Sequence, residues 1–345
     1  MILFDAPVEP DDLTYFVREV PTPGDLALLN EFDRVDSDDN TVDFGEIIRT
    51  NRTARFRSWD GRVHVSARDT AQDKRVKLLP LSSSLSEGEY ERLQREFARL
   101  GGTREQALER AIYNDAQQLT REVQARLEQA WGDVLSDGKL TISENGFAGE
   151  ADFGMPGNHN VSTSTAWTNA STATILTDIE TWAARWSDTN GTRPGRMKTS
   201  LARLRNVQRN KEVIDAIYGS TQGRTRVSIQ EVNELLEGEN LPTFDAPYDS
   251  QVDVDGVATR VIAADKVLFL PADLRELGYT AWGVSATALE LANSEQSEMS
   301  FEEAAGIVGV VFKEQGVPFR QYTYVDATAM PILADAKKLL VADVA

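Results

Sequence analysis

Apolar side chains recur every three or four positions through residues 103–136, and this spacing predicts one long amphipathic helix. At about 1.5 Å per residue, such a helix is roughly 50 Å long. The capping box Thr103–Gln106 predicts its start, and Gly138 predicts its end. Because the stripe is single and irregular, we expect it to lie across a sheet rather than in a dimeric coiled coil. The stripe comprises Leu108, Ile112, Ala116, Leu119, Val123, Leu127, Trp131 and Leu135.

A pattern with a period of two precedes this helix. Residues 54–59 and 62–67 alternate side-chain types on either side of Asp60-Gly61, a dipeptide that favours a type I′ turn. The pattern predicts a β-hairpin within residues 49–77. A two-stranded ribbon is marginally stable alone, so we expect this one to be ordered by a partner.

The first 48 residues contain four prolines, which exclude a single long helix and predict an extended arm. Such an arm cannot form a core of its own, so its order must come from contacts outside it. We expect Leu26, Leu28 and Leu29 to be its apolar anchors and to make an intersubunit contact. The arm would then be cleaved by proteases in the free subunit and protected in an assembly.

Shorter periodic segments follow the long helix. A strand is expected at 140–143, then a polar connection through residue 169, then a helix opened by the capping box Thr177–Glu180. The apolar side chains that this helix should bury are Leu176, Ile179, Trp182 and Trp186. Other short helices or strands are predicted at 90–100, 213–218, 229–236, 259–263 and 266–270, with a hairpin formed by 308–312 and 319–325.

Charge is distributed unevenly along the chain, whose formal net charge is −19. Residues 1–48 carry thirteen acidic and two basic side chains, whereas residues 49–77 carry nine basic and three acidic ones. Adjacent segments of opposite sign favour docking, within or between subunits. We predict that arginines of the hairpin contact an acidic surface of the adjacent subunit. These arginines are Arg55, Arg57, Arg62 and Arg68.

Composition excludes several classes of function. So acidic a chain is not attracted as a whole to nucleic acid or to an anionic membrane, and no apolar stretch approaches the roughly 18 residues of a membrane span. There is no cysteine, and the two histidines, His64 and His159, are expected at the surface. The chain therefore has too few of the residues that form catalytic triads, thiolate zinc sites and cysteine nucleophiles. We expect no catalytic, cofactor-binding or metal-binding residues.

Two charged clusters leave alternatives open. Asp249, Asp253 and Asp255 resemble the start of a calcium loop, but Gly256 follows at the wrong offset and no closing glutamate appears. The basic run within residues 193–211 contains no acidic residue. It is either a solvated helix flank or a contact for nucleic acid or for an acidic neighbour.

The order of these segments resembles that of the major capsid proteins of tailed phages, which have the Hong Kong 97-like fold, and especially the lambda-type major capsid protein E family. The motifs that carry the resemblance are Gly45-Glu46-Ile47-Ile48-Arg49 before the hairpin, Leu78-Leu79-Pro80 after it, Gly138-Lys139-Leu140 after the long helix, and Met330-Pro331-Ile332-Leu333-Ala334-Asp335 near the end. The resemblance implies an α+β fold with an N-terminal arm (1–48), an E-loop (49–82), a P-domain (83–170, with a spine helix at 103–136), an A-domain (171–317) and P-domain return strands (318–345).

The resemblance also implies a function. Pentamers and hexamers of the chain would tile an icosahedral phage head that encloses double-stranded DNA, assembled in the host cytoplasm. The implied partners are other copies of the chain, a portal, a separate scaffolding protein and a decoration protein, with no membrane. The alternatives are an encapsulin-like compartment around a cargo enzyme and, from another class, a soluble α/β enzyme acting on sugars or phosphates.

Overall fold

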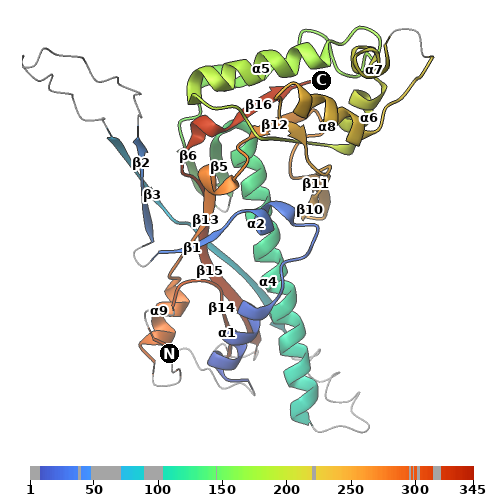
Figure 1. Ribbon diagram of the computed structural model, residues 1–345. Coiled ribbons are helices and arrows are strands. Elements are labelled where there is room, and N and C mark those ends of the chain that lie inside the picture. The colour runs from blue at the N-terminus through green and yellow to red at the C-terminus, as the bar shows by residue number, and fades with distance from the viewer. Residues whose placement is uncertain are drawn as a thin grey trace, which may run out of the picture.

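The computed structural model describes residues 8–37, 40–47, 71–88, 104–144, 146–219, 223–294, 297, 299–300, 304–313 and 320–345. These residues form two lobes along one long helix, α4 (Arg104–Asp137), as Figure 1 shows. One lobe, which we call the body, is built on the sheet around β15 and packs along α4. The other, the helical lobe, is built on the sheet around β12 and lies at the C-terminal end of α4.

The predicted long helix is confirmed. Every residue of the predicted stripe from Ile112 to Leu135 is at most 3% exposed, and α4 lies against β15 and β4 of the body. Gly138 follows the helix with a φ of 76°, and its amide donates to the carbonyl oxygen of Val134 at 2.8 Å. A left-handed glycine at this position ends the helix, as the sequence predicted. The helix therefore lies across a sheet, as expected.

The central strand of the body is β15, which pairs along both of its edges. On one edge β13 and β14 follow one another, and β4 occupies the opposite edge, all antiparallel. The short β1 lies parallel to β13. The bounds are β1 (Arg34–Asp36), β4 (Pro80–Glu87), β13 (Gly278–Gly283), β14 (Val308–Lys313) and β15 (Gln321–Leu333). The hairpin predicted near the C-terminus is confirmed as the β14–β15 pair.

The helical lobe contains a five-stranded sheet in the order β7-β16-β12-β8-β9. Its strands are β7 (Asn160–Ser162), β8 (Arg196–Thr199), β9 (Thr243–Phe244), β12 (Lys266–Leu270) and β16 (Leu340–Asp343). Its helices are α5 (Ile175–Asn190), α6 (Leu201–Arg209), α7 (Lys211–Tyr218) and α8 (Ile229–Gly238). The core between them is rich in aromatic residues: Trp182 stacks on Trp167 and meets the ring of Phe269 edge-on.

The start of α5 differs from its prediction. The helix begins at Ile175, so Thr177 lies inside it and does not cap it. The Thr177 hydroxyl donates to Oε1 of Glu212 at 2.8 Å, and Oε2 of Glu212 accepts from the Leu176 amide at 2.8 Å. A carboxylate from α7 thus replaces the predicted capping box. The four apolar residues predicted to be buried by this helix are buried, at most 7% exposed.

Three two-stranded pairs and a short helix lie outside these two sheets. They are the pair β2 (Thr41–Ile47) with β3 (Ala71–Lys77), the pair β5 (Lys139–Glu144) with β6 (Phe147–Asp152), the pair β10 (Gln251–Val254) with β11 (Val257–Arg260), and α9 (Ala286–Ala292). The strand β6 lies where a polar connection was expected. The predicted hairpin tip at 54–67 and the helix at 90–100 lie outside the described residues.

The arm is not extended throughout, contrary to the prediction. It contains α1 (Pro10–Glu19) and α2 (Ala27–Glu31). Pro10 occupies the first turn of α1, where no amide donor is required, and Pro21 and Pro23 follow the end of this helix. The prolines therefore delimit a short helix instead of preventing one.

Strand pairing joins segments that the resemblance assigned to different domains. β2 pairs with β3, so the ribbon starts inside the predicted arm, before residue 49. β13 and β14 were placed in the A-domain (171–317), yet they pair with β15 in the body. β16 was placed among the P-domain strands (318–345), yet it pairs with β12 in the helical lobe. The chain thus passes from the helical lobe to the body and back, because strands distant in sequence share a sheet.

Among the described helices, none is long and apolar enough to cross a membrane.

Candidate assembly surfaces

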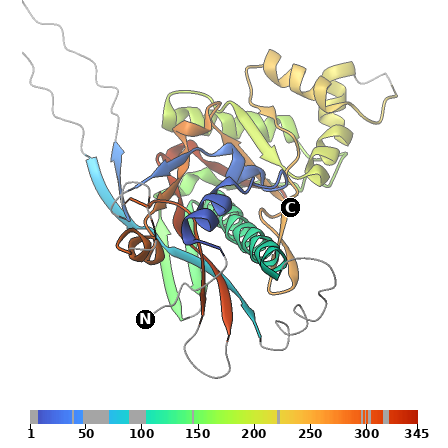
Figure 2. The ribbon, with the colours of Figure 1, turned by 90° about the horizontal axis from the view of Figure 1, so that it is seen from below.

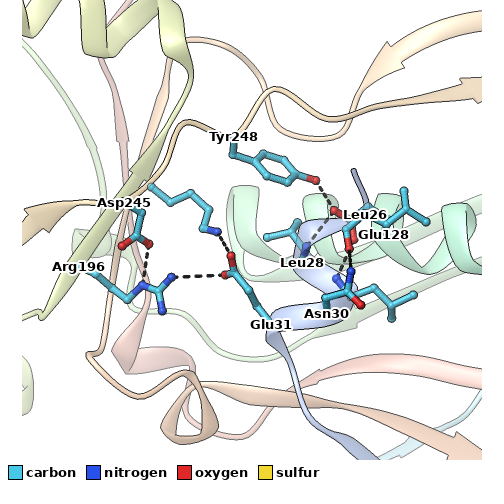
Figure 3. Close-up of polar contacts among 10 residues, drawn as sticks. Leu26, Leu28, Asn30, Glu31, Glu128, Arg196, Asp245 and Tyr248 are labelled. Carbon is cyan, nitrogen blue, oxygen red and sulfur yellow. Dashed lines mark hydrogen bonds and ion pairs between the residues drawn. The ribbon is translucent and has the colours of Figure 1, made fainter. Parts of the chain in front are cut away.

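The carboxylate of Glu128, on α4, holds the start of the arm helix α2. Its Oε1 accepts from the Leu28 amide at 3.0 Å, and its Oε2 accepts from the Leu29 amide at 2.7 Å. The Tyr248 hydroxyl, from the helical lobe, donates to Oε1 at 2.6 Å (Figure 3). α2 has no side-chain cap of its own, so Glu128 satisfies amides that the helix leaves free. One side chain thereby joins the arm, the long helix and the helical lobe.

Glu128 is fully buried, which is costly for a charged group unless hydrogen bonds compensate. Burial raises the pKa of this carboxyl above its ordinary value, while the Tyr248 hydroxyl, the two amides and the charge of Lys198 oppose that rise. The three donors are therefore the reason why the carboxylate can occupy this position. It binds α2 through charge-assisted hydrogen bonds, which are stronger than neutral ones.

A second polar cluster joins the arm to the helical lobe beside the first (Figure 3). Glu31, at the end of α2, accepts from Lys198 Nζ at 2.5 Å and lies 3.5 Å from Nη2 of Arg196. The same arginine donates through Nε to Asp245 at 2.7 Å. Lys198 is only 4% exposed, so its pairing with Glu31 compensates a buried charge. Two residues of the basic run at 193–211 therefore contact an acidic neighbour, which is the arm of the same chain.

The predicted apolar anchors of the arm lie within the subunit. Leu26 and Leu28 are 4% and 0% exposed in the core shared by α4 and both lobes, and Leu29 is half-buried beside the body. Phe32 stacks on Trp131 of α4 with ring centroids 3.7 Å apart. Leu26 and Leu28 therefore anchor the arm to its own chain, and the intersubunit contact predicted for the three leucines stays a prediction.

The other arm helix docks on the body. Leu13 and Val17 of α1 are fully buried between β14 and α4. The Thr14 hydroxyl donates to the carbonyl oxygen of Gly309 at 3.2 Å and accepts from the amide of the same residue at 3.3 Å. Arg18 donates to the carbonyl oxygen of Ile307 at 3.0 Å. The basic residues predicted for intersubunit contact, Arg55, Arg57, Arg62 and Arg68, lie outside the described residues, as does His64.

The second histidine is not at the surface, contrary to the prediction. His159 is fully buried, with Nδ1 2.8 Å from the carbonyl oxygen of Leu339 and Nε2 3.0 Å from the Thr189 hydroxyl. Burial lowers the pKa of this imidazole below its ordinary value. Both ring nitrogens are used to tie α5 to the C-terminal segment, so the role of the side chain is structural.

Two of the three aspartates that resembled a calcium loop have other partners. Asp249 pairs with Arg260 and accepts from the Leu201 amide, and Asp253 accepts from the Gly256 amide at 2.6 Å in the β10–β11 turn. Across the described ranges, no group of three or more histidine, aspartate or glutamate side chains is placed to hold a metal ion.

A polar groove of about 950 Å³ runs along the exposed side of α4, between the β5–β6 and β10–β11 hairpins. Its acidic lining residues are Glu122, Glu144, Asp253 and Asp255, and its basic ones are Arg121 and Arg126. Arg126 already pairs with Glu144 at 2.8 Å. The groove therefore carries a net negative charge.

A family model described as phage major capsid protein E matches residues 10–300 of the chain. The chain belongs to the phage major capsid protein E family. The match therefore favours a phage capsid protein over the encapsulin-like alternative. The family and the fold are those of structural proteins of the capsid. No curated protein matches the sequence.

Several solved structures have a fold similar to that of the capsid protein. A crystal structure described as a prophage capsid protein from E. coli CFT073 is 14% identical, with a TM-score of 0.63 and 100% of each chain covered. A phage-related protein from Bordetella bronchiseptica RB50 is 15% identical, with a TM-score of 0.51 and 98% of each chain covered. The capsid of Myoviridae phage XM1 is 11% identical, with a TM-score of 0.51 and coverage of 92% and 91%. These similarities establish the Hong Kong 97-like fold.

Sequence reasoning missed the residues of the capsid protein that hold its arm. Thr120, Gln124 and Glu128 recur every four residues beside the apolar stripe of α4, and all three are buried. Gln124 donates to the carbonyl oxygen of Val20 at 3.3 Å, so two of the three contact the arm. Polar residues at helical spacing next to an apolar stripe were a signal for a docked segment with unsatisfied backbone groups.

Proposed function

We propose that this capsid protein assembles into pentamers and hexamers that tile the icosahedral head of a phage around double-stranded DNA. The family match over residues 10–300 is the observation that carries the proposal. The ribbon supports it, because β2 and β3 pair with each other and with no other strand among the described residues. A two-stranded ribbon of this kind is marginal without a partner, and a neighbouring subunit provides one.

The remaining parts of the proposal concern partners and place. The chain serves as a structural protein without catalytic activity or cofactor, and its partners are further copies of itself, a portal, a scaffolding protein and a decoration protein. Its net charge of −19 keeps the shell from adhering to packaged phosphate, so contact with DNA is non-specific proximity. Assembly takes place in the host cytoplasm, and the finished protein resides in the virion.

The intersubunit contact that we propose joins the basic segment to the polar groove. Arg55, Arg57, Arg62 and Arg68 supply positive charge, and the groove beside α4 of the adjacent copy supplies the carboxylates of Glu122, Glu144, Asp253 and Asp255. A surface ion pair contributes only about 0.2–1 kcal/mol. Repetition of such pairs around every ring makes their sum substantial.

Assembly of the purified full chain tests the function. Analytical ultracentrifugation and negative-stain microscopy, over a range of protein concentrations and with co-expressed scaffolding protein, should reveal shells, rings or tubes. A compact monomer under all of these conditions would contradict the proposal.

A further inference from the structure

The side chain of Asn40 holds the base of the β2–β3 ribbon to the body. Its Nδ2 donates to the carbonyl oxygen of Val284 at 2.7 Å, and its Oδ1 accepts from the amide of the same residue at 2.7 Å. The amide group thus pairs with Val284 much as the backbone of a neighbouring strand would. The carbonyl oxygen of Asn40 accepts from the Leu78 amide at 2.9 Å. This hydrogen bond joins the residue before β2 to the residue after β3, at the base of the ribbon.

Two local features permit this contact. Asn40 has a φ of 54°, in the left-handed region that asparagine tolerates better than most residues. Gly283 leaves space for the amide, because a Cβ atom at this position would lie 2.1 Å from Oδ1 of Asn40. An alanine at position 283 would therefore displace the Asn40 side chain.

Because the ribbon is long, a small rotation at its base moves its far end by several ångströms. β2 and β3 form a separate two-stranded sheet, and Figures 1 and 2 show it pointing away from the body. β2 has seven residues, so at about 3.3 Å per residue its far end lies about 23 Å from the base. A tilt of roughly 10° at the base moves that end by about 4 Å, which exceeds the tolerance of a hydrogen bond or ion pair.

We propose that Asn40 is a positioning residue that sets the direction of the ribbon, and so determines where the segment 49–70 meets the adjacent subunit. The consequence for the shell rests on the proposed function. Without the amide pair the ribbon tilts more freely, and subunits join at a wider range of angles. Asn40 then acts on shell curvature through the direction of the ribbon.

A distance measurement in unassembled subunits tests the positioning role independently of shells. The chain has no cysteine, so cysteines substituted for Gln72, at the far end of β3, and for Gln118, on α4, can be spin-labelled selectively. Double electron–electron resonance should give one narrow distance distribution in the parent protein. Asn40→Gly, which keeps the positive φ but removes the side chain, should broaden it at least twofold. An unchanged width, or a broad distribution in the parent, would overturn the inference.

Gly283→Ala should disrupt the contact between Asn40 and Val284 without changing Asn40 itself. It should broaden the distribution while Asn40 is present and have a smaller effect in the Asn40→Gly background, because only the Leu78 side chain, with Cδ1 2.9 Å from the added Cβ, then remains to be displaced. Additive effects of the two substitutions would count against the contact. Circular dichroism checks the fold, and if Asn40→Gly does not fold, Asn40→Asp replaces it, since it keeps the acceptor for the Val284 amide but loses the donor.

The consequence for the shell is read by microscopy of unlabelled protein. Asn40→Gly should lower the fraction of closed shells several-fold in favour of tubes and open sheets, relative to the parent and to Asn240→Gly, the same substitution at an exposed asparagine that also has a positive φ. Closed shells at the parent frequency would refute a role in curvature. If the parent forms no shells, the proposed function fails, and the distance measurement still decides the role of Asn40.

Discussion

At the scale of single residues, Glu128 shows how a helix can be capped from far away in the sequence. Leu28 and Glu128 are 100 positions apart, yet the carboxylate accepts hydrogen bonds from the Leu28 and Leu29 amides in the first turn of α2. Glu212 does the same for α5. A short helix without a capping side chain of its own thereby becomes dependent on a specific neighbour.

Removal of the Tyr248 hydroxyl tests this arrangement. Tyr248→Phe keeps the ring in the core and removes one of three donors to the buried carboxylate. Hydrogen bonds to charged groups contribute about 1.5–3 kcal/mol, so the free energy of unfolding should fall by about that amount. Chemical denaturation of the subunit measures the change. Equal stability of the two proteins would show that the hydroxyl does not support Glu128.

The raised pKa of Glu128 makes a prediction about pH. In the unfolded chain this carboxyl titrates near its ordinary value of about 4.3, whereas burial places the pKa of the folded state higher. Between the two values the folded protein retains a proton that the unfolded chain has released. The free energy of unfolding contributed by this group therefore rises as the pH falls through that window.

The variant Glu128→Gln cannot titrate and provides the comparison. As the pH falls from neutral toward the ordinary glutamate value, the unfolding free energy of the parent should increase relative to that of the variant. The other groups facing the site, Lys198, Glu31 and Tyr248, are common to both proteins and cancel in the difference. Parallel stability curves would mean that the pKa of Glu128 is not raised.

At the scale of elements, the sequence predicted best what local periodicity controls. The stripe of α4 was visible because each apolar residue follows the last by three or four positions, whatever it packs against. The start of α5 was mispredicted because Thr177–Glu180 has the residues of a capping box, while the actual cap, Glu212, comes from another helix. His159 was misplaced for a similar reason: its partners, Leu339 and Thr189, are distant in sequence.

The buried face of α4 can be tested with one charged substitution. Leu119 is fully buried between the arm and the body, so Leu119→Asp places an unpaired carboxylate in the core at a cost of several kcal/mol. We expect insoluble protein or a large loss of thermal stability. Asn114→Asp, at an exposed position of the same helix, is the matched control and should behave like the parent. Soluble, normally stable Leu119→Asp would contradict the burial of the stripe.

At the scale of the whole molecule, the family was recognisable from the order of its segments, whereas the strand pairings within each lobe were not. β13 and β14 belong to the body and β16 to the helical lobe because of pairings with strands far along the chain. No local pattern encodes such pairings. The same limit applies to the arm leucines, whose apolar character was evident while their partner, the same chain, was not.

Charge reversal tests the proposed contact between subunits. Arg57→Glu combined with Arg62→Glu should leave the circular dichroism and thermal stability of the subunit unchanged and reduce the yield of shells strongly. Arg57→Lys with Arg62→Lys preserves the charge and is the control. Reversal of Asp253 and Asp255 to lysine in the same protein should restore part of the yield if the groove is the acceptor. Normal shells from the arginine reversal would remove the basis for the contact.

Cryo-electron microscopy of the particles formed by the full chain tests the central claim most directly. We predict closed shells with icosahedral symmetry, in which rings of five and six subunits each show a helix about 50 Å long beside a sheet, and a ribbon that lies on the adjacent subunit. A purified chain that stays monomeric at every concentration and with its scaffolding protein, or particles whose subunits lack this arrangement, would contradict the account.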